Sequence, residues 1–445
     1  MKFSLMLAVV LSLCLGAAGF AQDTPVPKTP IQDTNGPSHL GSEAPALAID
    51  TDLETGNLLV AGFTLGAVYD SRGLYNTGVT PFYSSDTRFF FEPNVGFQRT
   101  FTTGGWTLSY SPGVSFSQHD TSNDQYAQDL AADFHWKPNP YVLLHARTDY
   151  SITNNPFETV GNVDLLPGLG GPFGPNYDGV LPQTKRTSLV ATGDATLRMT
   201  DHSAVGVTGN FQKYNYDAVT TSAGTLIFPF INSEVISGSV FYSQQFSPTV
   251  DAGVQLAYTD IYSTGAQISR TQAPAPMLFV KWNPTSRWAL TFYGGPEYAR
   301  TRTVVPPVVF THNWYPTFGG TVAWSGHRNA FDAQGMRRIS NGGGLLNAVL
   351  DTNAGAGYRT RLAQKLLAEL RANWSDEKGI GLGSGAWFHS LWLGGGPVVE
   401  LNRSLTVRMD AGWVNQSEKG LNATPGNHVL VQGALDYRFH KSLGD

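Results

Sequence analysis

Apolar and polar residues alternate along most of the chain, from about Leu59 onward, in stretches of about 10 to 15 residues. The last stretch, HVLVQGALDYRFH, shows the alternation most clearly. Its apolar side carries Val429, Val431, Leu435, Tyr437 and Phe439, and the residues between them are mostly polar or small. Successive side chains of a β-strand point to opposite faces, so this pattern predicts strands with one apolar face and one polar face.

Counting these stretches predicts eighteen strands, with sixteen as the alternative. They lie near 59–70, 88–99, 105–117, 126–137, 140–152, 184–200, 203–216, 231–246, 249–262, 274–283, 286–301, 315–325, 328–340, 351–361, 363–375, 387–400, 404–416 and 427–440.

The connections between these strands alternate between tight and long. Tight joins fall at 102–105, 137–140, 200–203, 246–249, 283–286, 325–328, around Leu362 and at 401–404. The other connections are longer and rich in Gly, Asn, Ser, Thr and Pro. Eight tight joins among eighteen strands place both ends of the sheet on the same side. Short turns on one side and long loops on the other are typical of bacterial membrane barrels.

Composition narrows the fold further. The chain has 49 glycines, 12% aromatic residues and only 14% charged residues. A soluble β-sandwich would carry charged residues on its solvent face, whereas here the more apolar face runs through nearly every strand. Tryptophans stand near the ends of that face, as in the aromatic girdles of membrane barrels. They are Trp106, Trp136, Trp282, Trp288, Trp374 and Trp413. The fold class is therefore all-β, a closed antiparallel transmembrane β-barrel.

The first residues predict export. A basic residue, an apolar run from about Leu5 to Leu15 and small residues before Gln22 indicate a signal peptide over 1–21, cleaved after Ala21. Residues 22–58 are predicted to be a flexible periplasmic segment, too short for a folded plug. The barrel is expected over 59–440, followed by a short extension over 441–445. The one cysteine, Cys14, lies in the signal, so the mature chain has no disulfide or cysteine metal site.

At this level of pattern the chain resembles the porin-like outer-membrane β-barrels of Gram-negative bacteria. The most specific part is the final strand, where Leu435, Tyr437 and Phe439 look like the alternating signal read by the barrel-assembly machinery. The resemblance implies a place among outer-membrane lipid and lipopolysaccharide. It also implies a channel for passive diffusion of small hydrophilic solutes or ions. The alternative is a barrel serving surface polysaccharide export or adhesion. Such barrels are often homotrimers, and the oligomeric state stays open.

Residues opposite the apolar face are expected to line a lumen too wide for side chains to fill. The pore-lining candidates are Arg147, Asp149, Asp194, Arg198, Arg359, Arg361, Glu369, Arg371, Arg408, Asp410, Asp436 and Arg438. Charges are tolerable there because water solvates them, and they could set selectivity. The alternative reading is that pairs such as Arg147 and Asp149 merely hold the wall together.

The longest loop, over 153–184, is rich in glycine and proline and carries several leucines. Because the corresponding loop of porins folds into the barrel, the resemblance implies that this loop constricts the pore. Glu158, Asp164 and Asp178 are then the constriction candidates. An external loop that covers the mouth or makes subunit contacts is the alternative.

Catalysis and metal binding are not expected. His–Ser and His–Asp neighbours such as His389 and Ser390 point oppositely on a strand, so neither can act as a base for the other. The histidines are scattered, and no carboxylate cluster has calcium-loop spacing. No cofactor is expected. A net charge of −5 argues against a nucleic-acid surface.

Overall fold

The computed structural model describes residues 56–76, 81–118, 124–153, 185–217, 219–220, 226–228, 230–264, 268–303, 308–344, 346–381, 385–402, 404–419 and 426–442. The signal peptide, most of the N-terminal segment and the 441–445 extension beyond Ser442 lie outside these residues.

Long strands make up nearly all of the described chain. They are β1 (Gly56–Asn76), β2 (Pro81–Phe101), β3 (Gly104–Ser117), β4 (Gln125–Asn139), β5 (Val142–Thr153), β6 (Arg186–Thr200), β7 (Ser203–Tyr216), β10 (Asn232–Ser247), β11 (Val250–Thr264), β12 (Ser269–Thr285), β13 (Trp288–Thr303), β14 (Phe310–Ser325), β15 (Asn329–Gly342), β16 (Leu346–Ala363), β17 (Leu366–Gly379), β18 (Trp387–Glu400), β19 (Leu405–Lys419) and β20 (Gly426–Ser442).

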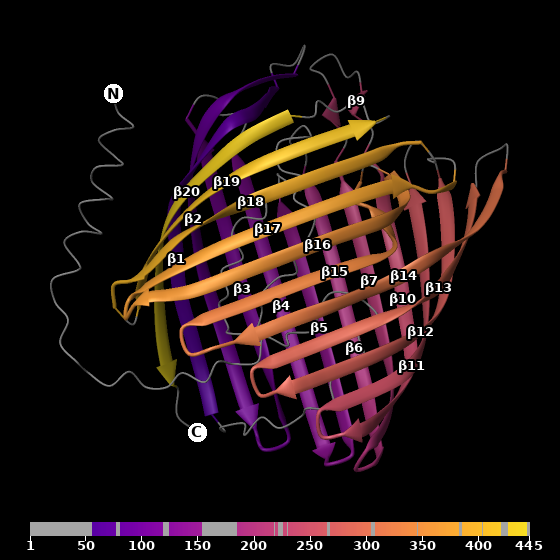
Figure 1. The fold of residues 1–445 in the computed structure, drawn as a ribbon. Coiled ribbons are helices and arrows are strands. Elements are labelled where there is room, and N and C mark those ends of the chain that lie inside the picture. The colour runs from indigo at the N-terminus through magenta and orange to yellow at the C-terminus, as the bar shows by residue number, and fades with distance from the viewer. Residues whose placement is uncertain are drawn as a thin grey trace.

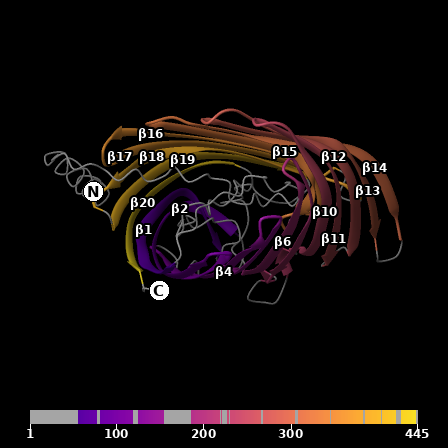
Figure 2. The ribbon, with the colours of Figure 1, turned by 90° about the horizontal axis from the view of Figure 1, so that it is seen from below.

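These strands form one antiparallel sheet of eighteen strands that closes on itself (Figures 1 and 2). Neighbours in sequence pair in order, β7 pairs with β10, and β1 pairs with β20 to complete the ring. The eighteen-strand prediction and the closed barrel are confirmed. Between β7 and β10 the chain also forms a small separate hairpin, β8 (Val219–Thr220) with β9 (Leu226–Phe228), which the sequence pattern did not indicate.

Strand ends differ from the predicted ranges mainly on the long-loop side. β1 runs to Asn76 and β2 begins at Pro81, where alternation is weak in the sequence. β14 begins at Phe310 and β16 at Leu346, each five residues before the predicted start. Backbone pairing therefore continues beyond the part of each strand whose side chains alternate between apolar and polar.

The outer surface is a continuous apolar band. Outward residues such as Leu130, Leu278 and Phe318 are exposed, and the exposed large apolar residues recur at every second position of their strands. All ten tryptophans except Trp392 occupy outward positions. A closed barrel satisfies its backbone hydrogen bonds internally, and an apolar exterior suits contact with hydrocarbon. The exterior is thus that of a β-barrel that spans a membrane. None of the helical structure among the described residues is long and apolar enough to cross a membrane.

Inward aromatic rings lie over inward glycines of neighbouring strands. A Cβ added at Gly206, for example, would lie 2.3 Å from the ring of Phe241. Aromatic cover of a strand glycine recovers packing that the glycine alone would lose. The other pairs are Phe90 with Gly66, Phe279 with Gly253, Tyr293 with Gly319, and Trp392 with Gly412. These pairs keep large rings flat against the wall, which leaves room inside the barrel.

Candidate functional site

The predicted pore-lining residues all lie at inward positions. In β20 the exposed side chains are Val429, Tyr437 and Phe439, so Asp436 and Arg438, at the alternate positions, face the interior. The same reasoning places the other ten candidates inside: Arg147 and Asp149 on β5, Asp194 and Arg198 on β6, Arg359 and Arg361 on β16, Glu369 and Arg371 on β17, and Arg408 and Asp410 on β19. Their part in transport stays a prediction.

One side of the interior carries a group that we call the arginine wall, comprising Arg359, Glu369, Arg371, Arg408 and Asp436 on β16, β17, β19 and β20. Glu369 pairs with Arg359 at 2.8 Å and with Arg371 at 2.5 Å, and Arg408 lies 3.5 Å from Asp436. The arginine side chains are the more exposed members, at 58% for Arg359 and 41% for Arg371 against 12% for Glu369. Water inside the barrel therefore meets mainly guanidinium groups on this wall.

A second group, the carboxylate wall, comprises Asp133, His145, Arg147, Asp149 and Asp194 on β4, β5 and β6. His145 lies between two carboxylates, with Nε2 2.8 Å from Asp133 and Nδ1 2.9 Å from Asp194. Arg147 and Asp149 form an ion pair of 2.8 Å. Here the order of exposure is reversed, since Asp149 is 28% exposed and Arg147 only 12%.

The two walls face each other across the barrel. Counted around the ring of eighteen strands, β5 and β17 are separated by eight strand positions in one direction and ten in the other. Both groups lie in the half of the barrel near the tight turns, because the turns at 140–141 and 364–365 are close to them in sequence. In this half of the interior a surface rich in arginines thus lies opposite a surface rich in carboxylates, and the two create an electric field across the space between them.

The sequence suggested pairing between neighbouring strands, as Arg359 on β16 with Glu369 on β17 shows, but Arg147 with Asp149 and Glu369 with Arg371 pair within one strand. Arg408, in contrast, pairs with Asp436 on the adjacent strand, and Asp436 also accepts a hydrogen bond from Thr64 across the closing seam between β1 and β20. These contacts brace the wall, and the unequal exposure of the partners still leaves net charge facing the water.

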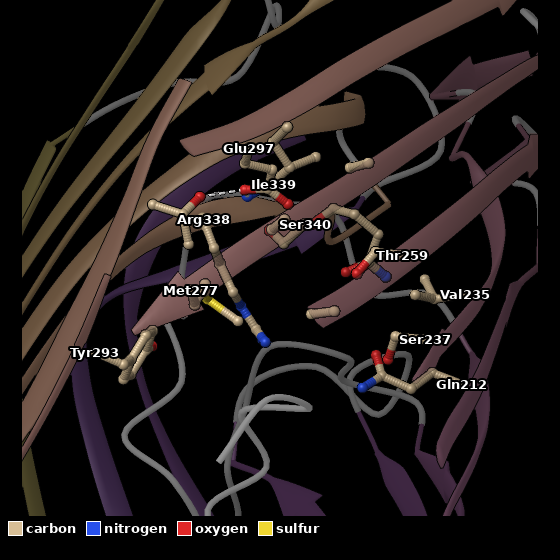
Figure 3. Close-up of a pocket in the computed structure, with 15 residues that line it drawn as sticks. Gln212, Val235, Ser237, Thr259, Met277, Tyr293, Glu297, Arg338, Ile339 and Ser340 are labelled. Carbon is tan, nitrogen blue, oxygen red and sulfur yellow. Dashed lines mark hydrogen bonds between the residues drawn. The ribbon is translucent and has the colours of Figure 1, made fainter. Parts of the chain in front are cut away.

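The other half of the interior contains a feature that the sequence analysis missed. The tip of the β15–β16 hairpin, described over residues 338–344 and 346–350, lies against the inner faces of β10, β11, β12 and β13. Between this tip and the wall is a cavity of about 60 Å³ whose lining includes Ser237, Thr259, Met277, Tyr293 and Arg338 (Figure 3). The available signal was a set of apolar residues at inward positions, Val235, Ile261, Ala273 and Ala299, where the other strands carry polar ones.

Nearly all of the predicted constriction loop falls between the described residues Thr153 and Lys185. Glu158, Asp164 and Asp178 lie outside the described residues, as does nearly all of 153–184. Within the described ranges, no group of three or more His, Cys, Asp or Glu side chains could hold a metal ion.

No family model matches the chain, and no curated protein matches it either. Among solved structures, it is similar to OccAB4 of Acinetobacter baumannii at 10% identity and a TM-score of 0.42, covering 88% of this chain and 100% of that one. It is similar to OccK3 (OpdO) of Pseudomonas aeruginosa at 13% identity and 0.41, covering 86% and 96%. It is also similar to the ferric-catecholate import receptor Fiu of E. coli K12, at 9% identity and a TM-score of 0.41, covering 85% of this chain and 81% of that one. Likenesses this low add nothing to the fold described above.

Proposed function

We propose that the protein is an outer-membrane channel through which small hydrophilic solutes or ions diffuse passively. The observation that carries the proposal is the contrast between the two faces of the barrel. Its exterior is apolar, and half of its interior is lined by ion pairs with partly exposed charged groups. Charges of this kind are stable only where water solvates them, so a wet lumen is the state that fits them.

The opposed walls extend this proposal to selectivity. A solute with separated positive and negative groups can align between exposed arginines and exposed carboxylates, whereas an apolar solute gains nothing there. Arg359 and Arg371 on one side, and Asp133, Asp149 and Asp194 on the other, are the residues that we expect to act on permeating solutes. Since both signs are present, we expect moderate ion preference rather than strict exclusion of one sign.

The alternative function is surface polysaccharide export or adhesion without free diffusion. Such a barrel can share the strand pattern and the apolar exterior, so those features do not separate the two functions. Only the state of the lumen does, because an adhesin needs no open water path.

Conductance in planar bilayers separates these functions. The purified full-length mature protein should produce stepwise current increases, each of constant size, in potassium chloride. A sample prepared identically from cells carrying an empty plasmid controls for contaminating channels. Repeated absence of steps from folded protein would reject the channel and favour export or adhesion.

A further inference from the structure

The β15–β16 hairpin leaves the barrel wall partway along its length. β14 pairs with β13 along its full length, up to Phe310 opposite Arg302. Its pairing with β15, however, runs only from Ser325 to Phe318, which lies opposite Arg337. β15 and β16 remain paired with each other up to Gly342 and Leu346. Beyond Arg337 the hairpin has therefore parted from β14, while β16 stays paired with β17 as far as Val349 opposite Gly379. We call the described residues of this part, 338–344 and 346–350, the ribbon.

Contacts at the tip show where this ribbon goes. The Tyr216 hydroxyl of β7 donates to the Gly343 carbonyl at 2.9 Å, and the Ile231 N–H donates to the Gly344 carbonyl at 2.9 Å. Around the ring β7 and β15 are six strand positions apart, or about 29 Å along the wall at a strand spacing of about 4.8 Å. A direct hydrogen bond between them requires the ribbon to cut across the interior.

An apolar cluster fixes the ribbon to the inner wall. Ile339, Ala348 and Leu350 of the ribbon, with Ile380 just after β17, pack against the inward residues of four consecutive strands, and every member is buried. The wall members are Val235 on β10, Ile261 on β11, Ala273 on β12 and Ala299 on β13. On any other part of a wet interior these side chains would be exposed to water, so the two apolar surfaces stabilise each other by contact.

Polar contacts place the ribbon in one position on that surface. Where β15 parts from β14, the Ile339 N–H donates to Glu297 Oε2 of β13 at 3.1 Å, and Thr317 of β14 donates to the same oxygen (Figure 3). At the tip, Asn341 Nδ2 donates to Ser233 Oγ at 3.0 Å. Glu297 thus accepts the backbone hydrogen bond that β14 would otherwise have accepted.

Glycines allow the turn to fit against β7. Gly343 and Gly344 have φ of 58° and 91°, a region that other residues adopt at a cost. A Cβ at Gly344 would also lie 2.7 Å from the ring of Tyr216. The turn sequence is therefore matched to a position inside the barrel.

From these contacts we propose that residues 338–344 and 346–350 form a fixed constriction of the channel, docked on the inner face of β10–β13, and that they limit the size of the solutes that pass. This proposal rests on the proposed channel function. A two-stranded ribbon occupies about 10 Å of the lumen, roughly two strand spacings, so its removal should widen the path and raise the conductance. Solutes then pass beside the ribbon, along the arginine and carboxylate walls.

The first test replaces residues 339–348, which include Ile339, Ala348 and the hairpin tip, with a short Gly-Ser turn in the full-length protein and compares single-channel conductance with that of wild type. Val349 and Leu350 are kept because they pair with β17. Circular dichroism and heat-modifiable gel mobility check that the barrel is folded. If wild type conducts and the variant has a larger single-channel conductance, the constriction is supported. Equal conductance overturns the constriction and leaves the channel function standing.

The two remaining outcomes separate the proposals further. A silent wild type with a conducting variant would support the inserted ribbon as an obstruction, while overturning passive diffusion as the native function. If both folded proteins are silent, the constriction and the channel function both fail.

A second test examines docking without relying on conductance. In a Cys14→Ser background, the Ser233→Cys/Asn341→Cys pair should form a disulfide on mild oxidation of the folded barrel. The Ser233→Cys/Ser325→Cys pair is the control, because Ser325 adjoins the tight turn at the other end of the barrel. Peptide mapping by mass spectrometry reads the cross-link. Free thiols in the first pair, or equal cross-linking in both pairs, would overturn the docked position.

Discussion

The charge of the arginine wall should set part of the ion selectivity, and Arg359→Ser/Arg371→Ser tests this. Both side chains are substantially exposed within the lumen, at 58% and 41%, so their removal changes the charge that a permeating ion meets. Glu369 loses its ion pairs with both arginines, and its negative charge then counts more on the same surface. The variant should therefore shift preference from anions toward cations.

The size of the shift follows from Coulomb interaction through water. A unit charge about 10 Å from an ion in water contributes about 0.4 kcal/mol, which screening at 0.1 M salt reduces to about 0.15 kcal/mol. Two arginines then contribute about 0.3 kcal/mol, with opposite sign for anions and cations, so the anion-to-cation permeability ratio should fall about threefold. At 0.01 M salt, where the screening length is about 30 Å, the same calculation gives about sevenfold.

Reversal potentials measured in a salt gradient across a planar bilayer report this ratio directly. The matched control is Arg300→Ser/Arg302→Ser on β13, which removes the same charge from two exposed outward side chains that lie over Phe310. That control should leave the ratio unchanged. If the lumen variant causes no shift, or if its shift does not grow as salt is lowered, the argument that exposed wall arginines govern selectivity is refuted.

Two further predictions concern stability, read as the midpoint of thermal unfolding by heat-modifiable gel mobility. Gly206→Val should destabilise the barrel by about 1–3 kcal/mol because its side chain would overlap the Phe241 ring. Gly209→Val is the control, since an added Cβ there meets nothing within 4 Å, and it should not destabilise the barrel. Equal unfolding midpoints of the two variants would contradict the packing of the Phe241 ring over Gly206. Leu130→Arg, on the outward face midway along β4, should lower the free energy of unfolding in lipid by about 2–4 kcal/mol. Ala131→Arg, at the next and inward position, should change it little. If the outward arginine is tolerated as well as the inward one, the outward face does not contact lipid.

Much of the fold follows from the alternation in the sequence. Because one face of each strand contacts lipid and the other contacts water, a period of two is imposed on every strand, and its phase tells which side chains point inward. In β20 that phase alone separates Tyr437 and Phe439 from Asp436 and Arg438. The alternation also predicts the positions of the tight joins, since a two-residue turn between two long strands leaves few other places where the chain can reverse direction.

The polarity of the two walls could not be read in the same way. In the sequence each ion pair consists of one positive and one negative residue, for example Arg147 with Asp149 and Arg371 with Glu369, so neither sign is favoured. Which partner is exposed depends on the side-chain conformation and on the neighbouring strands. The Arg147 side chain is largely buried against its wall, whereas the Arg371 side chain is substantially exposed. This difference depends on packing, which the local sequence does not encode.

The inserted ribbon escaped prediction for a related reason. Ile339, Ala348 and Leu350 continue the outward phase of their strands, and an outward apolar residue fits lipid as well as it fits an apolar inner wall. Alternation therefore looks the same whether a ribbon stays in the wall or folds inside it. The distinguishing evidence lies on other strands, at the inward apolar residues of β10–β13.

An apolar patch inside a wet barrel implies a cover, and this reasoning applies to any inward position of the molecule. Phe241 is buried against the wall over Gly206, so it needs no other partner. Val235 and Ile261 have no such glycine, and water over them would be unfavourable, so some segment of the chain must lie there. The ribbon covers these apolar residues. The charged walls on β4–β6 and β16–β20 are then the part of the interior that water can wet. Under the proposed channel function, the solute path follows the part of the inner surface that water can wet, and the residues that dock the ribbon determine how wide that path is.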